Sequence, residues 1–74
     1  MNSLIEQVRR RPPSFTPEVA RAIRLKSGVS QVRLAQEVGV HPVTVTRWEH
    51  GTRTPSGVVG EQYRCLLRDL QEVL

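Results

Sequence analysis

Few side chains of this sequence are suited to covalent or metal chemistry. His41 and His50 are the only histidines, Cys65 is the only cysteine, and seven acidic residues are scattered along the 74 positions. A structural zinc site needs four close ligands, and no such cluster is present. Serine, histidine and aspartate form no nucleophile motif, and there is no glycine-rich phosphate loop. The sequence therefore predicts a protein that is not an enzyme and needs no metal or cofactor.

Arginine and lysine, by contrast, are abundant, and their chemistry is the binding of anions. Eleven basic against seven acidic residues give a net charge of +4. Residues 1–56 carry nine basic and four acidic side chains, so +5, whereas residues 57–74 carry two and three, so −1. This asymmetry favours a polyanion as the partner of the first part and a packing role for the second. Ordinary solubilising charge is the alternative.

A chain of this length holds one small domain. We expect residues 16–74 to form it, preceded in residues 1–15 by a short helix or a basic arm that contains Arg9–Arg11. A capping box of Ser3 and Glu6 favours the short helix. No apolar run is long enough to span a membrane, and a single cysteine suits a reducing compartment. We therefore expect a cytoplasmic protein.

The first clear helix of the domain begins at Thr16 and ends before Gly28. Thr16 is a preferred N-cap residue, Pro17 suits the first helical position, and Gly28 is a typical stop. Helical spacing predicts that one stripe of this segment is apolar; it consists of Val19, Ala22, Ile23 and Lys26.

Two shorter helices follow. Ser30 predicts the start of one that runs through Val38, with three small or apolar residues as its buried face: Leu34, Ala35 and Val38. Pro42 predicts the start of another that runs to His50, with Val45 and Trp48 facing inward. The β-branched residues 43–46 alone would favour a strand, but Pro42 and Gly51 bracket a segment with helical spacing.

The last helix follows a polar connection over residues 52–56. It carries a long apolar stripe of six residues: Tyr63, Leu66, Leu67, Leu70, Val73 and Leu74. We interpret Tyr63, Leu66, Leu70 and Leu74 as a candidate dimer surface, and a cover for the core is the alternative. Cys65 lies among these leucines as a small buried hydrophobe rather than a reactive thiol.

The two shorter helices fit the spacing of a helix-turn-helix. Counted from Gln31 as the first position, the fourth, eighth, tenth, fifteenth and eighteenth positions are apolar, the fifth is small, and the ninth is a glycine where the turn needs a positive φ. These positions hold Leu34, Val38, Val40, Val45, Trp48, Ala35 and Gly39.

These residues resemble the Cro and phage-repressor (XRE) helix-turn-helix family. The likeness covers residues 16 to about 57 and includes Val29-Ser30-Gln31, Leu34-Ala35, Val38-Gly39-Val40 and Arg47-Trp48-Glu49-His50-Gly51. It implies an all-α fold, a small four- to five-helix bundle that contains a helix-turn-helix and is similar to the lambda repressor. It also implies binding to double-stranded DNA as a homodimer, with the third helix in the major groove.

The resemblance further implies an ion pair between Arg24 and Glu49, with Arg24 also able to reach a phosphate. Gln31 matches the family's phosphate-contacting glutamine at a helix start. We expect further phosphate contacts after the third helix, from His50, Thr52 and Arg53.

Base readout is expected from the exposed side of the third helix, from His41, Pro42, Val43, Thr44 and Arg47. Arg47 can bind a guanine through both O6 and N7, and Val43 or Pro42 can contact a thymine methyl group. Many family members carry glutamines near this helix start, so the sequence His41-Pro42-Val43 leaves more to Arg47 and to DNA shape.

These features predict a sequence-specific transcriptional regulator, a repressor that occupies a two-fold operator. An antitoxin or another protein-interaction module that works through a protein partner is an alternative. A phage excision or architectural factor that bends DNA is a third hypothesis, although the paired strands of a wing are not evident in the sequence.

Overall fold

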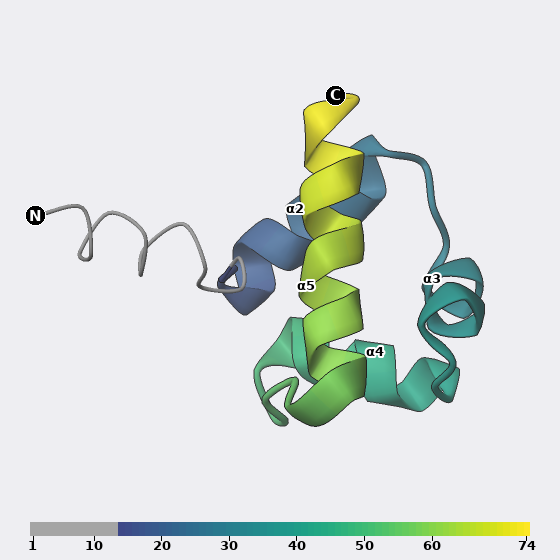
Figure 1. Ribbon diagram of the computed structural model, residues 1–74, viewed down its shortest axis with the longest axis vertical. Helices are drawn as coiled ribbons and strands as arrows, with labels where there is room; N and C mark the ends of the chain where they lie inside the picture. Colours follow the sequence, from purple (N-terminus) through teal and green to yellow (C-terminus); the bar gives the residue numbers. More distant parts are fainter. Residues whose placement is uncertain (1–13) are drawn as a thin grey trace, which may run out of the picture.

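The computed structural model describes residues 14–74 and shows four α-helices joined by short loops (Figure 1). They are α2 (Pro17–Lys26), α3 (Gln31–Val38), α4 (Pro42–His50) and α5 (Gly57–Glu72). The predicted all-α fold with a helix-turn-helix is therefore confirmed. The short helix or basic arm predicted for residues 1–15 falls almost entirely outside the described residues. No helix in the described part of the chain is long and apolar enough to cross a membrane.

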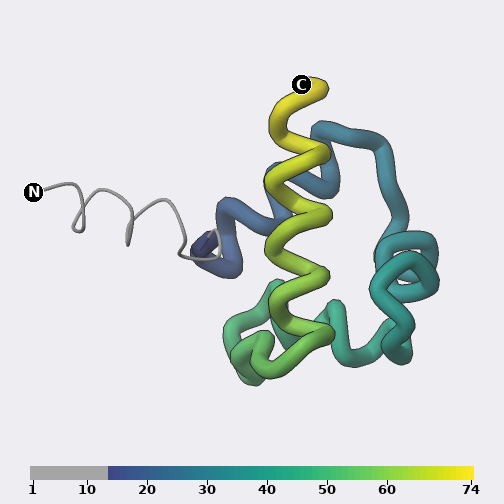
Figure 2. Tube along the Cα trace, viewed as in Figure 1, coloured from purple at the N-terminus to yellow at the C-terminus, as the bar shows by residue number. Residues whose placement is uncertain are grey.

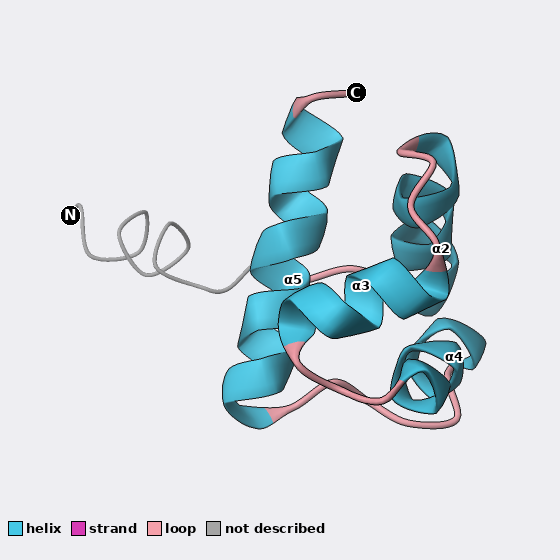
Figure 3. Cartoon of the chain, turned by 90° about the vertical axis from the view of Figure 1, so that its right-hand side faces the viewer, coloured by secondary structure: helices cyan, strands magenta, loops and turns pink. Residues whose placement is uncertain are grey.

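The predicted helix starts are confirmed by their caps. The Thr16 hydroxyl accepts a hydrogen bond from the Val19 N–H, and the Ser30 hydroxyl accepts one from the Arg33 N–H. The segment 43–46 is helical, and over the described residues Figure 3 shows only helices and loops. Proline at the first position of α4 fixes a helical φ, and this preference outweighs the β-propensity of the residues that follow.

The turn between α3 and α4 depends on Gly39. Its φ of 84° lies in the left-handed region, where a side chain would be strained, and its N–H donates to the Ala35 carbonyl. The tube in Figure 2 shows the chain changing direction between α3 and α4. The glycine predicted at the ninth position of the motif therefore has the expected conformation.

The long helix α5 spans the height of the domain, and α4 lies near its first turns (Figure 1). Helix α4 contacts both α2 and α3, and α5 packs against the same two helices. The core between them is made of nine buried residues: Ala20, Ile23, Leu34, Ala35, Val38, Val45, Trp48, Tyr63 and Leu67. The buried faces predicted for α3 and α4 are thus confirmed.

Trp48 and Tyr63 form the aromatic part of this core. Their ring centroids are 4.5 Å apart at an interplanar angle of 39°, a favourable tilted geometry. The Tyr63 side chain is 2% exposed, and its burial, reinforced by the nearby Glu49 charge, raises its pKa to about 12. The prediction that Tyr63 belongs to a dimer surface is therefore wrong, because the ring is needed inside to cover Trp48.

The apolar stripe predicted for α2 is also wrong. Val19 is 43% exposed and Ala22 is exposed, whereas Ala20, Ile23 and Arg24 are buried. The helix is rotated by about one residue from the predicted orientation. The reason is Arg24, whose charged group pairs with Glu49 in the interior, so that a polar residue occupies a core-facing position that hydrophobic periodicity assigns to the surface.

Gly60 lies close against the backbone of the connection that precedes α5. A Cβ built at this position would lie 2.6 Å from the carbonyl carbon of Pro55. Backbone atoms cannot move aside as the end of a flexible side chain can. The absence of a side chain at Gly60 therefore lets the connection from α4 fold back against the second turn of α5.

We predict that Gly60→Ala destabilises the domain by about 1–3 kcal/mol, the range typical of overpacking. Within a helix, alanine normally stabilises a protein by up to about 1 kcal/mol relative to glycine. A loss of stability in Gly60→Ala would therefore indicate that the added methyl group meets the Pro55 backbone. Urea unfolding followed by Trp48 fluorescence measures it, with Gln62→Ala on the exposed side of α5 as control. Equal or greater stability of Gly60→Ala would contradict the close approach.

Candidate nucleic-acid interface

One side of α4 is open to solvent and carries three of the predicted DNA-binding residues. Val43, Arg47 and His50 follow one another at four- and three-residue spacing, and all three are exposed. The opposite side of the helix holds the buried residues Val45, Trp48 and Glu49. Thus the helix that is fixed in the core by one face presents an uninterrupted row of side chains on the other.

The first turn of α4 is closed by His41. This residue is the N-cap, and its ring Nδ1 accepts a hydrogen bond of 3.1 Å from the Val43 N–H. Pro42 contributes no N–H, and the Thr44 N–H donates to the His41 carbonyl at 2.9 Å. Pro42 and Thr44 are half-buried beside the exposed row. The sequence analysis assigned His41 to base readout but did not identify it as a cap.

The last turn of α4 is closed by the residues that follow it. The Arg47 carbonyl accepts from the N–H groups of Thr52 and Arg53, at 3.1 and 3.3 Å, and from the Thr52 hydroxyl at 3.2 Å. The single hydroxyl proton of Thr52 is therefore used within the protein. Arg53 is exposed in the segment that follows this turn.

A buried ion pair joins α4 to α2. Arg24 donates from Nε to Glu49 Oε2 at 2.6 Å and from Nη2 to Glu49 Oε1 at 3.0 Å. Its third nitrogen, Nη1, donates to the Val29 carbonyl at 2.9 Å. The structure therefore brings together the two residues expected to pair. Arg24 is 8% exposed, and these bonds use three of its five N–H groups, so the phosphate contact also predicted for it stays a prediction.

Gln31 extends this pair into a network that reaches α3. Its Nε2 donates to Glu49 Oε1 at 3.0 Å, and its Oε1 accepts from the Thr46 hydroxyl at 2.8 Å. The side-chain amide thus bridges the start of α3 to two turns of α4. Gln31 was expected, from the family resemblance, to contact a phosphate, and Thr46 was not predicted to belong to the site. Helical spacing shows only that Thr46 is a neighbour of Pro42 and His50 on α4. It does not reveal that Thr46 bonds Gln31, which is fifteen residues away in the sequence.

The start of α3 keeps two backbone donors unbonded. Ser30 caps the Arg33 N–H, and its carbonyl accepts from Leu34, while the N–H groups of Gln31 and Val32 have no hydrogen-bond partner within residues 14–74. Two such N–H groups, together with the helix dipole, suit an anion such as a DNA phosphate. At this end of the helix, therefore, two backbone N–H groups are available beside the second N–H of the Gln31 Nε2, since only one Nε2 proton is bonded to Glu49.

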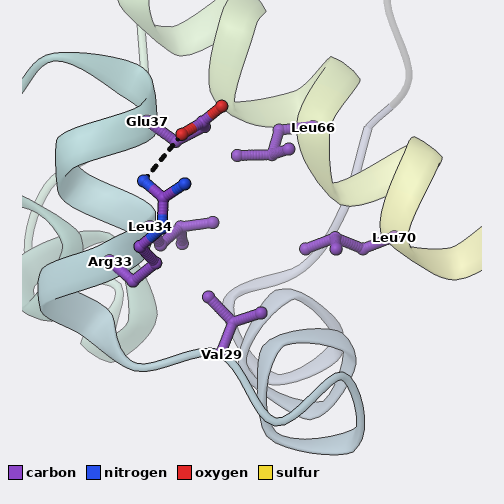
Figure 4. A pocket seen from close by; sticks show the side chains of 6 residues that line it. All are labelled: Val29, Arg33, Leu34, Glu37, Leu66 and Leu70. Carbon is purple, nitrogen blue, oxygen red and sulfur yellow. Dashed lines mark hydrogen bonds and ion pairs between the residues drawn. The ribbon is translucent and has the colours of Figure 1, made fainter.

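The remaining residues of the predicted dimer surface do not share one site. Leu66 and Leu70 are half-buried and line a shallow groove of about 170 Å³ with Val29 and Leu34 (Figure 4). An exposed ion pair of 2.8 Å between Arg33 and Glu37 lies at the side of this groove. Leu74 is turned instead toward the exposed side of α2.

No group of three histidine, cysteine, aspartate or glutamate residues suited to a metal ion occurs in the described part of the chain. Cys65 is a half-buried free thiol on α5. The exposed side of α4 and the turn after it carry hydrogen-bond donors, an arginine and apolar surface, which suit the binding of a partner.

Comparison with known proteins gives a match to a protein family. Residues 21–59 fit the model of a helix-turn-helix family. The match covers more than half of the 74 residues and contains α3, α4 and the turn between them. No curated protein and no solved structure matches the chain.

We predict that Glu49→Gln destabilises the domain by about 3 kcal/mol, because it leaves the Arg24 charge buried without a counter-charge. Arg33→Ala, which breaks the exposed pair with Glu37, is the control and should cost less than about 1 kcal/mol. Chemical unfolding of both variants measures the difference. Similar losses in the two variants would show that the buried pair does not carry the stability assigned to it.

Proposed function

Because the chain belongs to the Cro/C1-type (XRE) helix-turn-helix family of DNA-binding domains, we propose that it is a transcriptional regulator that binds a specific double-stranded DNA site through α4 in the major groove. The observation that carries the proposal is the exposed row of Val43, Arg47 and His50 on a helix whose other face is fixed in the core. An α-helix of this kind fits the width of the major groove.

Arg47 is the main base-reading residue in this proposal. Its side chain is exposed, and within residues 14–74 its guanidinium forms no hydrogen bond or ion pair. A guanidinium can donate to guanine O6 and N7 together, which discriminates against other bases by about 1–3 kcal/mol. Val43, one turn earlier and 43% exposed, suits the methyl group of a thymine. His41, Pro42 and Thr44 contact the bases or sugars nearest the start of the helix.

Phosphate contacts on either side of the groove fix the position of α4. On one side, the unbonded N–H groups at the start of α3 bind a phosphate next to Gln31. On the other side, His50 and Arg53 bind the backbone beyond the end of α4, with Thr52 closing the turn that holds them. Such contacts set the register of the protein on the duplex but carry no base sequence.

We further propose that the regulator is a repressor that occupies its operator as a homodimer. A single module of this size buries only about 600–1,000 Å² on DNA, and a second copy supplies the specificity that one copy lacks. The half-exposed leucines of α5, Leu66 and Leu70, are the surface offered for the second copy. A partner protein in the same groove, as an antitoxin would need, is the alternative occupant.

Selection of duplexes from a random DNA pool tests the proposed function. At about 150 mM salt, purely electrostatic binding is suppressed and sequence preference remains. We expect a two-fold motif with half-sites about one helical turn apart. With Arg47→Ala, the preference should relax at one base pair of each half-site. The control is Arg68→Ala, which removes the same charge from the exposed side of α5.

Two results would contradict the proposal. Absence of any enriched sequence, with binding that disappears as salt rises, would leave only nonspecific attraction to a polyanion. Identical motifs for Arg47→Ala and the wild type would remove Arg47 from base readout.

Sedimentation tests the dimer. We expect a dimer at micromolar concentrations in the wild type and a monomer for Leu70→Asp, because the substitution would bury a carboxylate in the interface. Val58→Asp is the matched control, since Val58 is an exposed valine of the same helix that does not line the groove. A wild-type monomer, or a dimer that survives Leu70→Asp, would refute this surface.

A further inference from the structure

The two histidines at the ends of α4 each bond a backbone group through Nδ1: the partner of His41 is an N–H donor and the partner of His50 is a carbonyl acceptor. At the start of the helix, His41 Nδ1 lies 3.1 Å from the backbone nitrogen of Val43. An amide N–H only donates, so Nδ1 must accept with its lone pair. The proton of the neutral His41 ring is therefore on Nε2.

At the end of the helix the situation is reversed. His50 Nδ1 lies 2.8 Å from the carbonyl oxygen of Thr46. A carbonyl only accepts, so Nδ1 must carry a proton and donate it. The Nε2 atom of a neutral His50 ring then has a lone pair and no proton.

Both rings are exposed, and they respond to a proton in opposite ways. Neutral His41 already has an N–H on its outer nitrogen, and a second proton on Nδ1 would break the cap of α4. Protonation of His50 at Nε2 leaves its bond to Thr46 intact and converts the outer nitrogen from an acceptor into a donor. A positive charge is also favoured at the C-terminal end of a helix.

The charged groups around His50 do not supply a counter-charge in the free protein. On its own helix and the following turn, Arg47 and Arg53 are positive, and Glu49 is bonded to Arg24 on the buried face. Helix α2, which packs on α4, carries Glu18, Arg21, Arg24 and Lys26, and none of them forms an ion pair with His50 in the described structure. Helix α3, which also packs on α4, carries Arg33 and Glu37, and these two residues pair with each other. A DNA phosphate oxygen is an acceptor, so it cannot bond a neutral His50 held in this orientation.

We propose that His50 takes up a proton when a DNA phosphate binds at the end of α4, whereas His41 contacts DNA as a neutral donor. This inference rests on the DNA-binding function proposed above. The bound state then holds one more proton than the free state, so affinity rises as pH falls through the range in which histidines titrate. One proton gives at most about a tenfold change in affinity per pH unit.

The experiment measures the affinity of the full chain for its selected duplex between about pH 6 and about pH 7.5 at constant salt. His50→Gln replaces the ring with a side chain that donates at every pH, and its affinity should not rise as pH falls. His41→Asn retains a capping oxygen and an outer donor, and its affinity should still rise as pH falls.

The outcomes separate this inference from the proposed function. Specific binding that does not vary with pH, or a pH dependence that persists in His50→Gln, would overturn the role of His50 and leave DNA recognition intact. Failure to bind any sequence specifically at every pH would defeat both. Imidazole nitrogen NMR of the free protein is a second test. We expect a proton on Nε2 of His41 and on Nδ1 of His50, and the reverse assignment would refute the inference.

Discussion

The buried ion pair between Arg24 and Glu49 is the interaction on which the arrangement of the helices depends. Removing both charges from water costs several kcal/mol per ion, and mutual attraction offsets this cost only if the remaining donors and acceptors are also satisfied. Here most of them are: Arg24 bonds both carboxylate oxygens and the Val29 carbonyl, and Gln31 donates a further hydrogen bond to Glu49. The side chain of Glu49 can therefore be almost wholly buried, at 1% exposure.

This network sets the orientation of α4 because few other interactions fix how the helix is rotated about its axis. Only Val45 and Trp48 contribute apolar burial from its nine residues. Apolar contacts are not directional, so a short helix with only two buried apolar side chains could rotate about its axis relative to its neighbours. The bonds from Glu49 to α2 and α3, and from Thr46 to Gln31, fix that rotation. The face that carries Val43, Arg47 and His50 is thereby directed outward.

The sequence was a good guide wherever structure is decided by local chemistry. Thr16, Ser30 and Pro42 predict helix starts because hydroxyl caps and a fixed proline φ act within one turn, and Gly39 predicts a turn because few other residues adopt a positive φ. Failures arise where partners are distant in sequence. The pairing of Arg24 with Glu49, 25 residues away, was expected only from the family resemblance, because periodicity does not reveal it. Periodicity put Tyr63 on the apolar stripe of α5 but could not decide between a dimer surface and the core, because its cover over Trp48 depends on how α5 crosses the domain.

For some site residues the sequence predicted a role in the site but not their hydrogen-bond partners, again because those partners are distant in the sequence. Gln31 was identified from its position at a helix start, where a surface role is the ordinary expectation, but its amide is occupied by Thr46 and Glu49. The type and position of a residue indicate which interactions its side chain can form locally. They do not indicate which of its donors and acceptors are bonded to residues that are distant in the sequence.

The shortness of α4 also ties recognition to stability. A nine-residue helix has unpaired backbone groups over much of its length, so its caps are a large part of what holds it. His41 closes one end and the Thr52 turn the other, and both lie where the duplex would be contacted. A change of base preference at position 41 therefore has to preserve a capping acceptor, which restricts the side chains available there. Arg47 forms no side-chain hydrogen bond within the described residues and is free of this restriction. Variation in the recognised sequence can accordingly arise more easily at Arg47 than at either end of the helix.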